Sequence, residues 1–173
     1  MELGMLIYHP LKDANHCTFR MLSILNDIEV GEISFDLLRL LDFYMLFPHL
    51  LKDIAPLPQH LSGYKKELKK IKEPYENLPL ASKLLFDLYP IQEYCVTSLL
   101  AKGIIKEDNF KKVNLIFVRG NLNNEILDLI STSKLKQEVW YKFLIEELPK
   151  INFYGTGGLK ARTTLMEYRY DAV

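Results

Sequence analysis

The chain has 173 residues, 49% hydrophobic and 25% charged, so it is long enough to bury a core and lacks the composition of a disordered or fibrous protein. Lysine plus arginine and aspartate plus glutamate each number 22, which excludes the overall positive charge of a protein that binds nucleic acid or membranes with its whole surface. We therefore expect a single domain over residues 1–173, in which any contact with nucleic acid is local.

The sequence predicts neither a secretory signal nor a membrane span. The apolar run at residues 5–8 has no basic residues before it and no small-residue cleavage site after it. The longest apolar candidate, residues 33–57, is interrupted by charged side chains and by Pro48. Cys17 and Cys95 lie inside apolar helical patterns, which is typical of buried free thiols. We expect a cytoplasmic protein with no membrane contact.

Two amphipathic helices are predicted in the first 50 residues. Apolar side chains recur at helical spacing over residues 15–28, and Asp13 or Asn15 is available as the N-cap. Ser34 can cap a second helix that Pro48 ends. The sequence therefore begins as a helical protein.

A connector rich in proline and glycine follows, and it leads into a charged helix from Lys65 to Lys72. Its lysines either contact DNA phosphates or form a solvated helix face balanced by Glu67 and Glu73. The first interpretation requires that they share a face with a second basic pair further along the chain. The lysines that would contact DNA are Lys65, Lys66, Lys69, Lys70, Lys111 and Lys112.

Residues 79–118 predict a winged-helix-like unit. A short helix over residues 80–89 precedes a second one that starts at Pro90 and ends at Gly103, and two strands follow, the second over residues 111–118. Helix, turn, helix, strand, turn, strand is the order of a winged helix-turn-helix. The apolar positions assigned to the second helix are Ile91, Tyr94, Cys95 and Leu99. The fold class expected is mainly α with a small β-wing.

Two further helices, over residues 121–131 and 134–148, and an extended tail over residues 151–173 complete the predicted fold. The tail contains the string YGTGGLKAR, in which glycines precede basic residues. It lacks the Gly-Lys-Ser/Thr of a P-loop, so a glycine turn between two extended segments is favoured over a phosphate site.

The sequence predicts no catalytic, cofactor or metal site. His9, His16 and Cys17 are candidate zinc ligands, but a fourth ligand at a usual spacing is missing. His16 and Arg20 lie one helical turn apart, where they either bind a carboxylate or phosphate or serve only the helix itself. A small enzyme that uses His16 or the tail glycines remains a third hypothesis. We expect a protein that binds other macromolecules and is not an enzyme.

Three strings carry a family resemblance: YHPLKDANHCTFRMLSIL at residues 8–25, LLRLLDFYMLFPHLL at 37–51 and GGLKARTTLMEYRYD at 157–171. Together they resemble the middle component of bacterial ABC three-component systems, the small subunit of Lamassu-type antiphage and antiplasmid defence operons. The resemblance implies a helical accessory subunit that assembles with an SMC- or Rad50-like ABC ATPase and an effector, often a nuclease, and that contacts double-stranded DNA, if at all, through the complex.

The family has no catalytic residues to carry over and implies no cofactor. The positions that the resemblance marks as structural or partner-interface residues are His16, Arg20, Asp42, Phe43, Arg162, Arg169, Tyr170 and Asp171. An alternative from another class is a free-standing winged-helix transcription regulator, which would bind DNA through residues 91–102 and the wing at 104–118.

Overall fold

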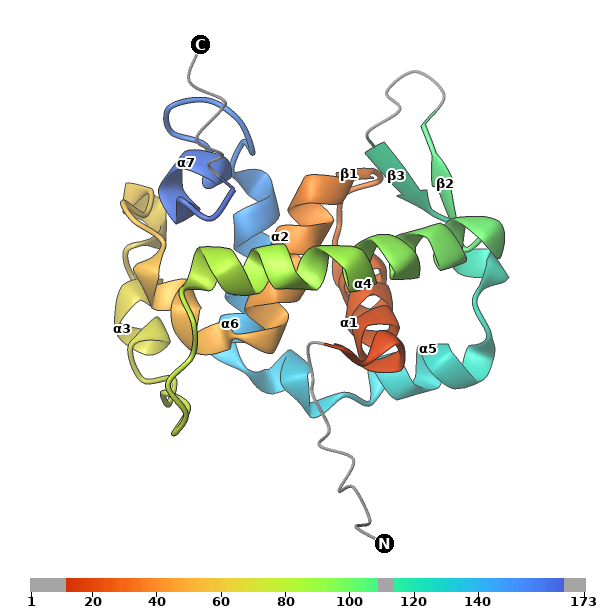
Figure 1. Cartoon of the computed structure of the whole chain (residues 1–173), viewed down its shortest axis with the longest axis horizontal. Helices are drawn as coiled ribbons and strands as arrows, with labels where there is room; N and C mark the ends of the chain where they lie inside the picture. The colour runs from red at the N-terminus through yellow and green to blue at the C-terminus, as the bar shows by residue number, and fades with distance from the viewer. Residues whose placement is uncertain (1–11, 109–113, 167–173) are drawn as a thin grey trace, which may run out of the picture.

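Three helices form the centre of the molecule in the computed structural model, which describes residues 12–108 and 114–166 (Figure 1). They are α1 (Ala14–Asp27), α2 (Phe35–Leu46) and α4 (Ala81–Ala101), and each contacts the other two. Their apolar faces meet in the core, where side chains such as Met21 and Leu40 are fully buried. Burying one such side chain contributes about 1.5–3 kcal/mol. The prediction of a mainly helical protein is confirmed.

The first two helices begin where the sequence predicts. The carboxylate of Asp13 accepts a hydrogen bond from the backbone N–H of His16 at 3.0 Å. The hydroxyl oxygen of Ser34 accepts one from the backbone N–H of Leu37 at 3.1 Å. Each cap satisfies an N–H group that has no partner inside the helix.

A three-stranded antiparallel sheet lies at one end of the helices, in the order β1-β3-β2. The predicted wing consists of β2 (Ile105–Glu107) and β3 (Asn114–Phe117). The third strand, β1 (Ile33–Ser34), pairs Ile33 with Leu115 of β3 and was not predicted. Two residues are too few to show the alternation by which strands are recognised.

The prediction of two helices that meet at Pro90 is wrong, because α4 runs through this proline without a break. Pro90 lies on the exposed side of the helix, where the carbonyl oxygen that loses its partner can be hydrated. The predicted end of the helix is confirmed, since Gly103 adopts a left-handed φ of 66°. A single helix, Ala81–Ala101, therefore takes the place of the predicted helix, turn and helix.

The other helical elements are shorter. They are η2 (Pro48–Asp53), η3 (Gln59–Leu61), α3 (Tyr64–Leu68), η4 (Arg119–Asn121), α5 (Asn124–Ser131), η5 (Lys134–Gln137), α6 (Val139–Lys142), the π-helical turn η6 (Phe143–Glu147), η7 (Leu148–Lys150) and α7 (Leu159–Thr163). Among the described helices, none is long and apolar enough to cross a membrane.

Three of the predicted segments differ from the observed elements. The charged helix expected to reach Lys72 ends at Leu68. The helix expected over residues 134–148 changes from 3-10 to α to π geometry along its length. The sequence did not predict this change, because apolar spacing indicates a buried helical stripe without fixing the hydrogen-bond pattern. The tail expected to be extended contains α7, whose single turn buries Leu159 and Thr163.

Candidate partner-binding site

A buried carboxylate joins α1, α2 and α4. Arg20 of α1 donates from Nε to Oδ1 of Asp42 in α2 at 2.7 Å, and from Nη2 to Oδ2 at 3.3 Å. Gln92 of α4 donates to the same Oδ2 at 2.8 Å. Asp42 and Gln92 are fully buried and Arg20 is 5% exposed. A charge in such a place must be paired and hydrogen-bonded, and two neighbouring helices supply the donors here.

Arg39 of α2 links the buried Gln92 of this network to Tyr89 on the outer side of α4. Its Nε donates to Oε1 of Gln92 at 3.1 Å, and the amide of Gln92 donates to the backbone oxygen of Arg39 at 3.1 Å. The guanidinium carbon lies 4.5 Å from the ring centre of Tyr89, at a distance suited to a cation–π interaction. Nη1 lies 3.5 Å from a carboxylate oxygen of Asp36.

The two cysteines lie beside the same carboxylate. Both are free and fully buried, which confirms the predicted buried thiols. The hydrogen bond with Cys95, burial and the nearby Asp42 all raise the pKa of Cys17, whereas that same hydrogen bond lowers the pKa of Cys95 to about 7. Cys95 also accepts a hydrogen bond from the Thr18 hydroxyl at 3.3 Å. Their complete burial keeps both thiols out of contact with solvent.

Arg20 keeps its charge in this environment. Burial lowers its pKa, but the carboxylate of Asp42 more than offsets this, and the pKa lies above its ordinary value. One nitrogen, Nη1, is buried without a hydrogen-bond partner. Arg20, predicted to bind a carboxylate or phosphate together with His16 or to serve only the helix, binds the carboxylate of Asp42, while His16 is exposed on the first turn of α1.

The residues marked by the family resemblance fall into three groups. Arg20, Asp42 and Phe43 lie in the core, so their described contacts are within the chain. His16 lies at the surface, and Arg162 binds backbone oxygens of two segments of the chain. The other three, Arg169, Tyr170 and Asp171, lie outside the described residues. Whether these positions affect partner binding stays a prediction.

Arg162 ties the C-terminal glycines to the connector between α2 and α4. Its Nε donates to the backbone oxygen of Gly157 at 2.6 Å, and its Nη1 donates to that of Pro56. A Cβ at Gly158 would lie 2.4 Å from the carbonyl oxygen of Tyr154, so only glycine fits there. The glycines thus serve a tight approach of backbone segments, and they lead into α7, not into a second extended segment.

The structure describes four of the six lysines predicted to contact DNA. Lys65, Lys66, Lys69 and Lys70 are exposed on and just after α3, and Lys70 pairs with Glu67 at 2.6 Å. Figure 1 places α3 at the opposite end of the molecule from the strands β2 and β3. The other two predicted lysines, Lys111 and Lys112, lie outside the described residues.

The outer side of α4 exposes aromatic rings. Phe86 is 67% exposed, Tyr94 64% and Tyr89 37%. Phe86, Pro90 and Tyr94 follow one another at intervals of four residues and so form one row along the helix. The hydroxyl of Tyr89 donates to the carboxylate of Glu93 at 3.1 Å. We call these five residues the α4 aromatic face. This face was not predicted, because Tyr94 counted as one of the apolar positions of the predicted helix.

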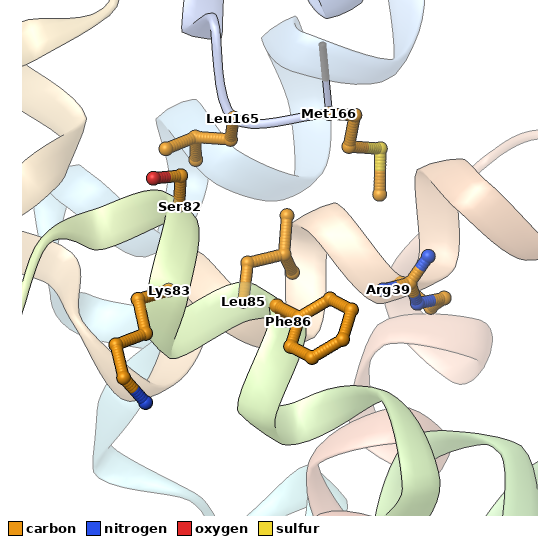
Figure 2. A pocket seen from close by; sticks show the side chains of 7 residues that line it. All are labelled: Arg39, Ser82, Lys83, Leu85, Phe86, Leu165 and Met166. Carbon is orange, nitrogen blue, oxygen red and sulfur yellow. The ribbon is translucent and has the colours of Figure 1, made fainter. Parts of the chain in front are cut away.

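An open pocket of about 290 Å³ adjoins the α4 aromatic face (Figure 2). Leu85 and Phe86 line it from α4, and Leu165 and Met166 line it from the segment after α7, with Arg39 at one side. Ser82 and Lys83 of α4 also line it, so the pocket combines four apolar side chains with two cations, Arg39 and Lys83.

Such an arrangement can bind a macromolecule, and its described residues offer no cluster for metal chemistry. Within residues 12–108 and 114–166, no group of three or more histidine, cysteine, aspartate or glutamate side chains could hold a metal ion. The exposed aromatic rings beside a partly apolar pocket are instead typical of protein-binding surfaces.

Comparison with known families accounts for nearly the whole chain. The model of the family described as "ABC-three component (ABC-3C) system Middle Component 5" matches residues 6–171. No curated protein and no solved structure matches the chain.

Proposed function

The chain belongs to the ABC-three component system Middle Component 5 family, and we propose that it is a non-catalytic adaptor that bridges the ATPase and the effector of such a system. The observation that carries this proposal is the family match, which leaves only seven residues of the 173 outside it. Membership implies partner subunits of the same system. We propose further that the ATPase is an SMC- or Rad50-like ABC protein, that the effector is a nuclease, and that the system is of the Lamassu type and acts against phages or plasmids in the cytoplasm.

The distribution of polar and apolar groups supports an adaptor role. Two charged residues of the first two family strings, Arg20 and Asp42, join α1 to α2 and, through Gln92, to α4, while Phe86 and Tyr94 of the α4 aromatic face are exposed. Interface cores are enriched in aromatic residues and depleted in charged ones. A subunit whose helices are joined by a buried ion pair and whose surface exposes aromatic rings suits the role of holding two others.

Co-expression with the ATPase and effector subunits of the same system tests the bridging role. Tagged effector is expected to retain the ATPase subunit when this chain is present and to lose it when the chain is omitted. The chain alone should bind each of the two in pairwise purifications. Equal recovery of an ATPase–effector complex with and without the chain would show that it does not bridge them.

A winged-helix transcription regulator is the second candidate function. We propose that the winged-helix-like unit consists of α1, β1, α2, α4, β2 and β3, with residues 47–80 inserted between its second and third helices, in place of the bounds 79–118. The sheet order with β3 in the middle supports this assignment. In that unit α4 would be the recognition helix, and its outer face is poorly suited to phosphates because it presents Glu93 and aromatic rings.

DNA binding by the isolated chain distinguishes the two functions. The adaptor proposal expects no sequence-dependent binding of the chain alone at low salt, in a fluorescence anisotropy titration with duplex DNA. Tight binding that depends on both sequence and salt would favour the regulator.

A further inference from the structure

We infer that the α4 aromatic face binds a segment of a partner subunit of the same system that presents lysine or arginine side chains among apolar ones. This inference rests on the proposed function and assigns the place and chemistry of one of its contacts. Exposed rings in one row make the face apolar, and the carboxylate of Glu93 among them makes it selective for cations.

The exposed aromatic side chains are too concentrated to be scattered surface residues. Phe86 and Tyr94 are each about two-thirds exposed, and Pro90 fills the position between them in the row. Single exposed apolar residues are ordinary, whereas a contiguous patch marks a binding surface. Aromatic rings also lose little conformational entropy when they are covered, which favours them as anchors.

Charge decides which partner fits the face. Between residues 86 and 101 the ionised side chains of α4 are two carboxylates, Asp87 and Glu93. Lys83 neutralises Asp87 at 2.6 Å, whereas the contact of Glu93 is the uncharged hydroxyl of Tyr89. Arg39, the cation from α2 that lies against Tyr89, is paired with Asp36 at 3.5 Å, so Glu93 leaves the middle of the face with a net negative charge, which attracts cationic side chains and repels phosphates.

The face already holds one cation in the way we assign to the partner. The Arg39 guanidinium lies over the ring of Tyr89, with its carbon 4.5 Å from the ring centre. Phe86 and Tyr94 expose equivalent rings on the same helix, and Glu93 lies between them in sequence. Lysine or arginine side chains of a partner can stack on these rings and pair with the carboxylate.

The neighbouring pocket supplies a place for an apolar side chain of the same segment. Leu85, Leu165 and Met166 line it, and Phe86 belongs both to the pocket and to the aromatic face (Figure 2). Interfaces gain most of their affinity from a few side chains that fill such pockets at the centre of the contact. A partner segment with one large apolar residue and neighbouring cations therefore matches both features.

Binding of purified wild-type and variant chains to the ATPase and effector subunits, each tested separately by biolayer interferometry, examines this inference. Tyr94→Ala should weaken binding to one of them at least about tenfold. The matched control is Tyr75→Ala, because Tyr75 is also exposed but lies outside the face, and it should bind like wild type. Circular dichroism melting curves check that both variants fold.

Charge variants test the cationic nature of the partner. Glu93→Lys should weaken binding more than Glu93→Gln, and Glu93→Gln should reduce the salt dependence of binding. Glu125→Lys is the control for charge reversal, since Glu125 is exposed on α5. A tighter complex with Glu93→Lys would overturn the assignment of a cationic partner segment.

The outcomes separate this inference from the proposed function. Wild-type binding that Tyr94→Ala and Glu93→Lys leave unchanged overturns the docking face and leaves the adaptor role intact. Failure of the wild-type chain to bind either subunit overturns the adaptor role, and the docking face with it. Low-salt binding of duplex DNA that Tyr94→Ala abolishes would assign the face to nucleic acid and overturn the inference.

Discussion

Asp42 is the residue on which the packing of the three central helices depends most. It accepts hydrogen bonds from Arg20 and Gln92 at a fully buried position. Asp42→Asn keeps the shape of the side chain but leaves the Arg20 charge without a counter-ion. We expect the free energy of unfolding to fall by about 3–5 kcal/mol, measured by urea denaturation.

Asp87→Asn is the matched control for this substitution. Asp87 also pairs with a cation, Lys83, but the two side chains are 37% and 62% exposed, respectively. Exposed ion pairs contribute about 0–1 kcal/mol, so this variant should unfold almost like wild type. Equal losses in the two variants would contradict a special role for the buried pair.

Gly158 is required by the close approach of two backbone segments. The Cβ of Gly158→Ala would meet the carbonyl oxygens of Tyr154 and Phe153 at 2.4 and 2.6 Å, so the segment before α7 must move. We expect a fall in melting temperature of several degrees, about what 1–3 kcal/mol produces in a domain of this size. Gly31→Ala has open space around its Cβ and should melt within about 1 °C of wild type.

For single residues, the sequence predicts which kind of interaction a side chain makes better than it predicts the partner. Asp42 lies inside an apolar string, which is typical of a residue in a buried ion pair, and it forms one with Arg20. The pairing itself joins residues 22 positions apart and depends on how α1 crosses α2. Gln92, which completes the network from 50 positions away, has no local signal that distinguishes it from a surface glutamine.

Pro90 is the feature of α4 that departs furthest from local rules. A proline inside a helix removes one hydrogen bond at a cost of about 3 kcal/mol, although it also restricts the unfolded chain by roughly 1 kcal/mol. Pro90→Ala should therefore raise the free energy of unfolding by about 1–2 kcal/mol in urea denaturation. Thr97→Ala, another exposed position of α4, should change it by less than about 0.5 kcal/mol.

Pro90 also explains why the sequence predicted two helices where the structure has one. Proline favours the first turn of a helix, so it predicted a new helix where the structure continues an old one. The capped starts of α1 and α2 and the glycine end of α4 were predictable because each depends on one or two neighbouring residues. β1 and α7 were not, since tertiary contacts fix both.

The whole molecule separates its lysine-rich end from its sheet. Lys65, Lys66, Lys69 and Lys70 lie around α3, and the strands β2 and β3 lie at the other end (Figure 1). A short duplex is therefore expected to contact one end at a time. The charge totals of the chain, which are equal in number and opposite in sign, conceal this division.

Replacing these four lysines with glutamine tests which end contacts DNA in the assembled complex. If each lysine contacts one phosphate, the slope of log affinity against log salt becomes shallower by about 0.9 per lysine. The comparison variant carries Lys102→Gln and Lys106→Gln, which lie at the sheet end. A loss confined to this second variant would place the DNA at the wing instead.

The contact between Arg162 and Pro56 also sets an order of events during synthesis of the chain. The two residues are 106 positions apart, so the ribosome adds the arginine about 5–20 s after the proline. Throughout that interval the connector lacks the side chain that fixes it in the finished protein. During the same interval the pocket beside α4 lacks two of the residues that line it, Leu165 and Met166. The pocket beside α4 is thus among the last parts of the molecule to form, and a nascent chain cannot offer it to a partner until translation has passed Met166.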